Sequence, residues 1–178
     1  MKKLLLPVLV MIIAASCSSV KISSDYDKSA GFASYKTFAL TQEALNYPMS
    51  ELDRTRILTA ITNELTAKGF TKSDNPDVLI DFNIKTQQQQ TATATSTGGY
   101  GYGYRYGWGG GFSTTTINYD TYTDGTLFID MIDASKKQLV WQGRGTKTLA
   151  EDASAATKEK NINYAVKQIF TKYPPAIK

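Results

Sequence analysis

A single cysteine near the start of the chain constrains what the mature protein can fold into. Cys17 follows Lys2 and Lys3, an apolar run over residues 4–13 and small residues at 14–16. A charged start, a short apolar core and small residues before a cleavage point are typical of a secretory signal. Because Cys17 is the only cysteine, the folded part has no intrachain disulfide and depends on an apolar core.

The position of Cys17 resembles the lipobox of bacterial lipoproteins, in which the thiol is acylated and becomes the new N-terminus. The alternative is an ordinary signal peptide with a cysteine near its end by chance. We favour the anchor, so the expected mature protein begins at Cys17 and is held in a membrane by acyl chains such as palmitate. The apolar run is too short to span a bilayer and is expected to leave with residues 1–16.

Composition excludes several classes of function. Removal of residues 1–16 from the 178-residue chain leaves 162 residues, enough for one domain with a real core. Without Lys2 and Lys3 the net charge falls from +4 to +2, and because charges of both signs are interspersed we expect no nucleic-acid partner. The absence of histidine excludes a Ser-His triad and imidazole zinc ligands. No EF-hand spacing occurs, and we expect neither a metal nor a cofactor.

The first half of the chain predicts short strands around one amphipathic helix. Apolar residues recur at helical spacing between a capping Ser50 and Gly69, a residue suited to the turn that ends a helix. After Asn75-Pro76, apolar and polar residues alternate, which predicts a strand with one apolar face. The expected elements are strands at 20–22 and 35–40, a turn at 25–28, a helix at 51–68 and a strand at 78–85.

The second half predicts a flexible insertion, a meander of strands and a final helix. Residues 86–116 begin with four glutamines and include eight glycines within 98–112, which favours a flexible excursion because glycine is costly to order. Asp124-Gly125 predicts a hairpin turn between strands at 114–123 and 126–133. A turn is expected at 134–137, followed by a strand at 138–147 with Trp141 in the core. Gly143 and Gly145 are expected to mark a bulge or a close backbone contact in this strand. The last expected element is a helix, ended by Tyr173-Pro174-Pro175.

This element order predicts an α+β fold: an antiparallel or mixed sheet of about five to six strands, with two helices packed on one face. The expected organisation is a signal peptide at 1–16, an acylated tether at 17–24 and one domain at 25–178.

Several segments, in this order, resemble a family of bacterial lipoproteins known as domain of unknown function 4136. They are Asp25-Tyr26-Asp27 with Phe32 and Ser34 to Phe38, the helix end Glu64 to Phe70, Pro76 to Ile80, Gly125 to Asp133, Leu139 to Gly143, and Ile169-Phe170 with Tyr173-Pro174. Members of this family tend to carry a Gly/aromatic insertion where this chain has residues 98–112. The resemblance implies an α+β lipoprotein of the cell envelope and offers no catalytic residues to transfer.

The Gly/Tyr segment at 98–112 is the candidate partner-binding loop. Aromatic rings can stack on sugar faces or on other rings, and an arginine adds cation–π contacts. The expected partner is an envelope polymer, such as peptidoglycan, or an envelope protein; a single arginine gives little attraction for nucleic-acid phosphates. The alternative is a low-complexity hairpin extension with self-associating rings. The candidate residues are Tyr100, Tyr102, Tyr104, Arg105, Tyr106, Trp108 and Phe112.

Carboxylates are the remaining candidates for chemistry. Two of them, about 5–10 Å apart across a cleft, can hydrolyse a glycoside. Linear spacing does not show which acids meet, and we expect turn-forming and solvated roles instead. The acids considered are Asp25, Asp27, Asp77, Asp81, Asp130 and Asp133.

The sequence therefore favours a lipid-anchored envelope protein that acts as a non-catalytic binding or structural module. The alternative is a carboxylate-based hydrolase of an envelope glycan. Ser18 after the acylated cysteine points, by analogy with Gram-negative sorting, to the outer membrane, and the absence of an acidic cluster there favours its periplasmic side. The partner and the oligomeric state stay open.

Overall fold

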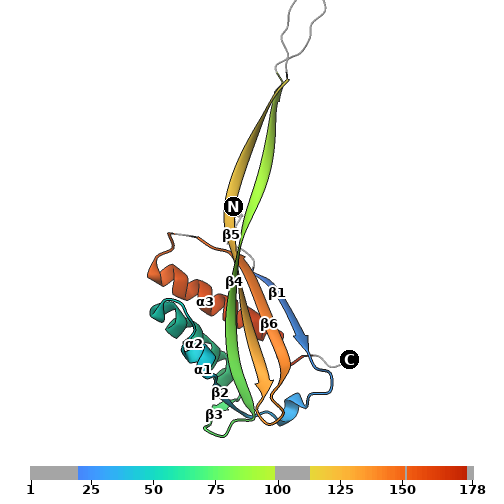
Figure 1. Cartoon of the computed structure of the whole chain (residues 1–178), viewed down its shortest axis with the longest axis vertical. Coiled ribbons are helices and arrows are strands. Elements are labelled where there is room, and N and C mark those ends of the chain that lie inside the picture. Colours follow the sequence, from blue (N-terminus) through green and yellow to red (C-terminus); the bar gives the residue numbers. More distant parts are fainter. Residues whose placement is uncertain (1–19, 99–112, 151, 176–178) are drawn as a thin grey trace, which may run out of the picture.

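The structure is a computed structural model that describes residues 20–98, 113–150 and 152–175. Within these residues a six-stranded mixed sheet has the order β1-β6-β5-β4-β2-β3, and helices cover one of its faces (Figure 1). The strand pairs are antiparallel except β4-β2 and β2-β3, which are parallel. The predicted α+β class, with five to six strands and two main helices on one face, is confirmed.

The elements follow one another along the chain as follows. They are β1 (Lys21–Tyr26), a 3-10 turn (Phe32–Ser34), β2 (Thr37–Leu40), α1 (Gln42–Leu45), α2 (Glu51–Ala67), β3 (Thr71–Lys72), β4 (Val78–Gly98), β5 (Ser113–Asp133), β6 (Gln138–Thr148) and α3 (Ala155–Phe170).

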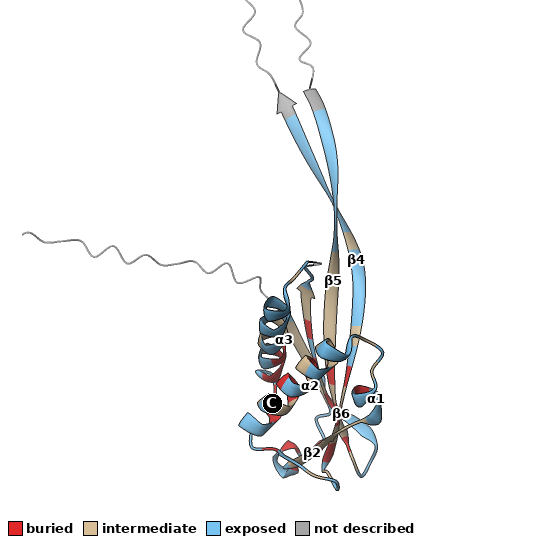
Figure 2. Cartoon of the chain, turned by 90° about the vertical axis from the view of Figure 1, so that its left-hand side faces the viewer, coloured by how far each residue is buried: buried red, intermediate tan, exposed pale blue. Residues whose placement is uncertain are grey.

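The core lies between the sheet and helices α2 and α3 (Figure 2). Trp141 of β6 is fully buried, as expected, and stacks on Phe170 of α3 with ring centroids 5.7 Å apart. Ile61 and Leu65 of α2 are also fully buried. The alternation predicted for residues 78–85 is confirmed, because Ile80 and Phe82 are buried while the intervening residues are not.

Glycine in β6 lets α3 approach the sheet. A Cβ atom added at Gly143 would collide with Ile169 of α3 and with the ring of Trp141. One added at Gly145 would lie 3.1 Å from Ile169 and from Ile22. The predicted close contact at these two glycines is confirmed, while the irregularity in pairing lies elsewhere, where the register between β5 and β6 shifts beside Met131 and Ile132.

The helix ends follow the predicted pattern in part. Gly69 has a φ of +89°, the left-handed conformation that ends α2 as expected. Ser50 precedes α2, but its side chain makes no capping hydrogen bond. By contrast, the hydroxyl oxygens of Thr41 and Ser154 accept from backbone N–H groups and cap α1 and α3.

Two predicted turns and the predicted insertion differ from the structure. Residues 86–98 and 113–116, expected in a flexible excursion, are paired strand residues of β4 and β5. Asp124-Gly125, expected as a hairpin turn, lies inside β5, because both residues pair with β4 on one side and with β6 on the other. The Asp124 carboxylate also accepts from the Thr148 hydroxyl, and Leu149 lies 2.8 Å from where a Cβ of Gly125 would stand. The predicted turn at 25–28 begins later, since β1 continues through Tyr26.

Among the described residues, no helix is both long and apolar enough to cross a membrane.

Candidate functional site

A two-stranded arm projects from the sheet. β4 and β5 are each 21 residues long and stay paired from Val78↔Asp133 to Gly98↔Ser113. β6 accompanies β5 only as far as Asp124↔Thr148, so beyond this point β4 and β5 continue alone (Figure 2). We call residues 87–98 and 113–123 the arm. At about 3.3 Å per residue the arm is about 40 Å long.

The edges of the sheet are closed where the arm begins. The Tyr47 hydroxyl accepts from the N–H of Ile84 at 3.0 Å and donates to its carbonyl at 3.2 Å, which satisfies the outer edge of β4. On the other side, the Leu149 N–H donates to the Thr123 carbonyl at 2.8 Å. Within the described residues, no third strand pairs with the arm, so its backbone edges are exposed beyond these two points.

The arm has two chemically different faces, since side chains alternate along a strand and cross-strand partners share a face. The apolar face carries Ala92, Ala94, Ile117 and Tyr119, with Gln88, Gln90, Ser96, Thr115 and Thr121 around them. The polar face carries Thr91, Thr93, Thr95, Thr116, Asn118 and Asp120, with Gln89 and the half-exposed Tyr122 at its base. Ile117 is 52% exposed and Tyr119 is 68% exposed, although both lie on the side that continues the core face of the sheet.

The predicted partner-binding loop starts and ends at the tip of the arm. Its residues, Tyr100, Tyr102, Tyr104, Arg105, Tyr106, Trp108 and Phe112, lie outside the described residues, and so does Cys17. Because Gly98 and Ser113 are paired, the segment between them is attached at the far end of the arm. The sequence analysis did not predict the arm whose far end carries this segment.

The start of the described chain lies at the base of the arm. Lys21 pairs with Thr146, near the end of β6 from which the arm departs. Cys17 is three residues before Val20. Since an extended chain spans at most about 3.6 Å per residue, Cys17 is within about 11 Å of Val20.

The face of the sheet that no helix covers carries a row of polar groups. Asp81, Asp130, Gln142 and Asp25 are successive cross-strand partners on β4, β5, β6 and β1. Asp130 accepts from the Gln142 amide at 2.8 Å, and Asp81 accepts from the Thr41 hydroxyl at 2.9 Å. Partial burial raises the pKa of Asp130, and the charge of Asp81 adds to this shift. Of the acids considered, Asp81 and Asp130 therefore lie directly opposite each other, and Asp77 lies close enough to Asp133 for their charges to interact.

Three other acids have structural roles: Asp27 and Asp133 accept within turns, as expected, while Asp77 joins two distant segments instead. Asp77 accepts from the Lys36 N–H, the Thr37 hydroxyl and the Thr37 N–H, each at 2.8 Å. These donors lower the pKa of the Asp77 carboxyl. The hydroxyl and N–H of Ser29 lower the pKa of Asp27 in the same way.

Asp133 is the third of these acids and the most buried, at 5% exposure. Its carboxylate accepts from the Ser135 hydroxyl, the Lys136 N–H and the Tyr35 hydroxyl, and these bonds hold its pKa far below the usual range. Ser135 is therefore a turn residue, and this turn uses Asp133 for structure rather than chemistry.

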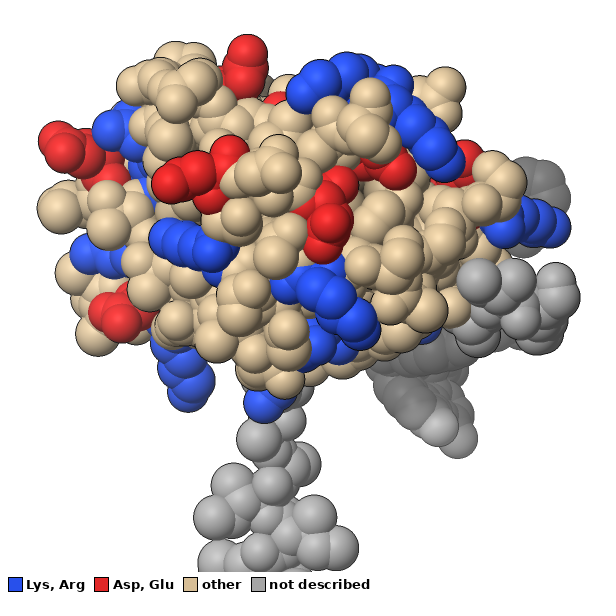
Figure 3. All heavy atoms as spheres, turned by 90° about the horizontal axis from the view of Figure 1, so that it is seen from below, with Lys and Arg blue, Asp and Glu red and all other residues tan. Residues whose placement is uncertain are grey.

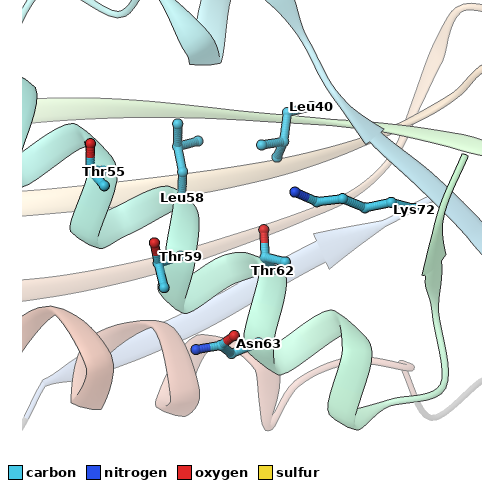
Figure 4. A pocket seen from close by; sticks show the side chains of 7 residues that line it. All are labelled: Leu40, Thr55, Leu58, Thr59, Thr62, Asn63 and Lys72. Carbon is cyan, nitrogen blue, oxygen red and sulfur yellow. The ribbon is translucent and has the colours of Figure 1, made fainter. Parts of the chain in front are cut away.

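Two of the hollows in the body of the domain are shallow, each of about 220 Å³. One lies between α2 and strands β2 and β3, where the Lys72 ammonium points toward Leu40 and Thr62 (Figure 4). Its hydroxyls come from Thr55, Thr59 and Thr62, a helical stripe that sequence reasoning did not use. The other is lined by Asp25, Tyr26, Asp27, Leu139, Val140, Trp141 and Gln142.

Charge and acid clustering give no further candidate in the part of the chain that the structure describes. At the end of the domain opposite the arm, basic and acidic side chains are interspersed (Figure 3). Among the described residues, no group of three or more acidic, cysteine or histidine side chains could hold a metal ion.

Comparison with known proteins identifies a family and a fold. The profile of the family described as "Domain of unknown function (DUF4136)" matches residues 22–175. A PDZ domain protein from Parabacteroides distasonis superposes with a TM-score of 0.54 at 20% identity, over 87% of this chain and 35% of that chain. The PelC dodecamer from Paraburkholderia phytofirmans gives a TM-score of 0.49 at 13% identity, over 86% of this chain and 96% of that chain. No curated protein was found to match the chain. The likeness to the PDZ domain protein shows only that the two chains share a fold.

Proposed function

The chain belongs to the DUF4136 family, and from this premise and the arm we propose a lipid-anchored envelope protein without chemistry of its own. In this proposal Cys17 is acylated, and the arm presents the Gly/Tyr segment to an envelope polymer or protein. The proposed location is the periplasmic side of the outer membrane. The proposed partner-contacting residues are Tyr100, Tyr102, Tyr104, Arg105, Tyr106, Trp108 and Phe112.

One observation carries this proposal: the arm leaves the domain at the end where β1 begins. A tether of about 11 Å from Val20 to Cys17 is much shorter than an arm of about 40 Å. An acylated Cys17 therefore puts the arm within reach of the membrane surface. The partner that this geometry favours is a glycan or protein exposed at that surface, since aromatic rings and one arginine suit sugar faces and protein side chains.

Photo-crosslinking in living cells tests the recognition role. A photoreactive residue in place of Tyr104 is expected to give a reproducible adduct with an envelope component. The matched control is the same residue in place of Lys72, which is exposed at the opposite end of the domain. If the folded, membrane-bound protein gives no adduct from position 104, the loop is a spacer and the recognition part of the proposal fails.

The anchor is tested separately. Cys17→Ala is expected to release the protein from the membrane fraction, since no acyl chain can then be attached. Ser18→Ala is the matched control and is expected to remain in the membrane fraction. Retention of Cys17→Ala in the membrane pellet would contradict acylation.

Asp81 and Asp130 favour a second candidate, a hydrolase of an envelope glycan. Directly opposed residues on neighbouring strands have Cβ atoms about 5 Å apart, so the two carboxyls can lie within the range of about 5–10 Å that glycoside hydrolysis uses. Burial and the nearby Asp81 raise the pKa of Asp130, which is the direction of shift that a general acid needs. Release of sugar from peptidoglycan or capsule, lost in both Asp81→Asn and Asp130→Asn, would support this candidate. No release by the natural protein would exclude it for those substrates.

A further inference from the structure

Within the described residues, no other element covers the apolar face of the arm. Ile117 and Tyr119 stand on β5, and the small residues Ala92 and Ala94 stand opposite them on β4. All four are exposed (Figure 2). Isolated two-stranded ribbons are marginally stable in water, so an arm of this length gains from a second layer on its apolar side.

We infer that this face binds the same face of a second copy of the chain, so that two arms pack against each other. The face lies in the described part of the arm, and its pairing with a second copy rests on the proposed membrane anchor, which raises the local concentration of the chain. It goes beyond the proposed function by naming the partner of the arm itself.

The register of the arm makes this face self-complementary. Ala92 lies beside Tyr119, and Ala94 lies beside Ile117 at the next level. A two-fold axis along the arm places β4 of one copy over β5 of the other. Tyr119 of each copy then stands over Ala92 of the other, and Ile117 stands over Ala94. Large side chains thus meet small ones at both levels, which is how two sheet layers interdigitate about 10 Å apart.

Charge is compatible with this packing. In the described part of the arm the charged side chain is Asp120, and its pairing with Thr91 places it on the polar face. Packing of the apolar faces therefore buries no charge, and the glutamines and threonines at the margins can keep contact with water. The two-fold arrangement also points both arms in the same direction, with the starts of both β1 strands on the same side.

The size of the face predicts a weak dimer. The whole side of the arm, with apolar residues at two levels and glutamines and threonines around them, is about 40 Å long and about 10 Å wide, so that two copies bury roughly 800 Å² in total. Stable interfaces bury about 1,200 Å² or more, so association depends on a high local concentration. Copies held on one membrane have such a concentration.

Photo-crosslinking of the full chain in cells tests this inference. A photoreactive residue in place of Tyr119 is expected to give a band of twice the chain mass, with the adduct mapped to the strand that contains Ala92. The matched control is the same residue in place of Asn118, the next position on β5, which lies on the polar face and is expected to give no such band.

A pair of charge variants, read with the Tyr119 probe, provides the second measurement. Ile117→Lys is expected to abolish the dimer band, because it places a charge in the apolar face. Thr116→Lys adds the same charge to the polar face and is expected to leave the band in place. Unchanged thermal unfolding of both variants shows that the domain is intact.

Three results would overturn the inference. Equal dimer bands from positions 118 and 119 indicate pairing through the exposed edges instead of the apolar face. An adduct from position 119 with lipid or with another protein assigns this face to a different partner. Absence of any dimer band from position 119, in folded protein at its normal level in the membrane, excludes a second copy.

Discussion

The hydroxyl of Tyr35 donates a hydrogen bond of 2.9 Å to the carboxylate of Asp133, a residue 98 positions later in the chain. This bond joins the segment before β2 to the turn between β5 and β6. The other oxygen of Asp133 accepts from the Ser135 hydroxyl at 2.7 Å and the Lys136 N–H at 2.8 Å. A single buried carboxylate therefore satisfies donors from two distant parts of the domain.

Asp133→Asn is expected to destabilise the domain by about 2 kcal/mol at neutral pH, because an amide cannot accept from all these donors and leaves some unsatisfied. The Asp133 pKa is lowered by folding, so its contribution is present above the unfolded pKa of about 4 and is lost as pH falls through the folded value. Urea unfolding at pH 7 and in acid checks this. A difference between variant and natural protein that does not shrink in acid would contradict the assignment.

Tyr35→Phe is expected to lose less stability at alkaline pH than the natural protein does. Burial, followed by the hydrogen bond to Asp133, raises the pKa of Tyr35 to about 12 from its usual 10. Its contribution is therefore complete below pH 10 and is lost as pH rises toward 12. Burial also raises the pKa of Tyr173 to about 12, so part of the loss stays in the variant. Tyr119→Phe, in the exposed arm, is the matched control and is expected to leave the alkaline unfolding curve unchanged.

Gly143→Ala is expected to destabilise the domain by about 3 kcal/mol, because the new methyl group meets the buried Ile169 and Trp141. Gly125→Ala is the matched control in the neighbouring strand. Its methyl group meets Leu149, which is 46% exposed and can move, so we expect a cost below about 1 kcal/mol. Denaturant unfolding of both variants measures the difference. Equal costs would show that α3 is not packed as closely on β6 as described.

Asp130→Asn is expected to stabilise the domain at neutral pH. Burial and the nearby Asp81 raise the Asp130 pKa, so the contribution of this group is present below its unfolded pKa and is lost as pH rises. Asparagine resembles the protonated acid and can still accept from Gln142. Thermal unfolding at pH 7 and in acid should show a gain only at pH 7. Asp74→Asn, at an exposed turn, controls for the loss of one negative charge, and a gain of the same size there would contradict the proximity argument.

Periodicity accounts for the parts of the fold that the sequence predicted. Ile57, Ile61 and Leu65 recur on one side of α2, and Ile80 and Phe82 alternate on β4, because each set contacts the same core. The arm carries threonine, glutamine and alanine where a core strand carries large apolar residues. The alternation of apolar and polar residues that indicates a strand is therefore weak in its sequence. Asp124-Gly125 has a strong local turn preference, but the pairing of both residues with β4 and with β6 overrides it.

The sequence indicated which residue types form the candidate site, but not where these residues lie in the fold. The Gly/Tyr segment is visible in the sequence, but its place at the tip of an arm depends on pairing between Gly98 and Ser113. Asp81 and Asp130 are 49 positions apart and meet through the register of β4 with β5, which no local pattern encodes. The parallel pairing of β2 with β4, which holds Thr41 beside Asp81, is likewise a tertiary feature.

Tyr47 lies at the edge of the sheet, just before β4 leaves the sheet as part of the arm. The Tyr47 ring packs on Phe82 with centroids 4.9 Å apart, and its hydroxyl bonds both the N–H and the carbonyl of Ile84. Tyr47→Phe keeps the ring but leaves these groups unpaired, so we expect a loss of about 1 kcal/mol and faster amide exchange at Ile84. Hydrogen exchange measured residue by residue checks this, with Tyr122→Phe in the arm as the matched control. Unchanged protection at Ile84 in Tyr47→Phe would mean that another group closes this edge, and the arm would then begin further along β4.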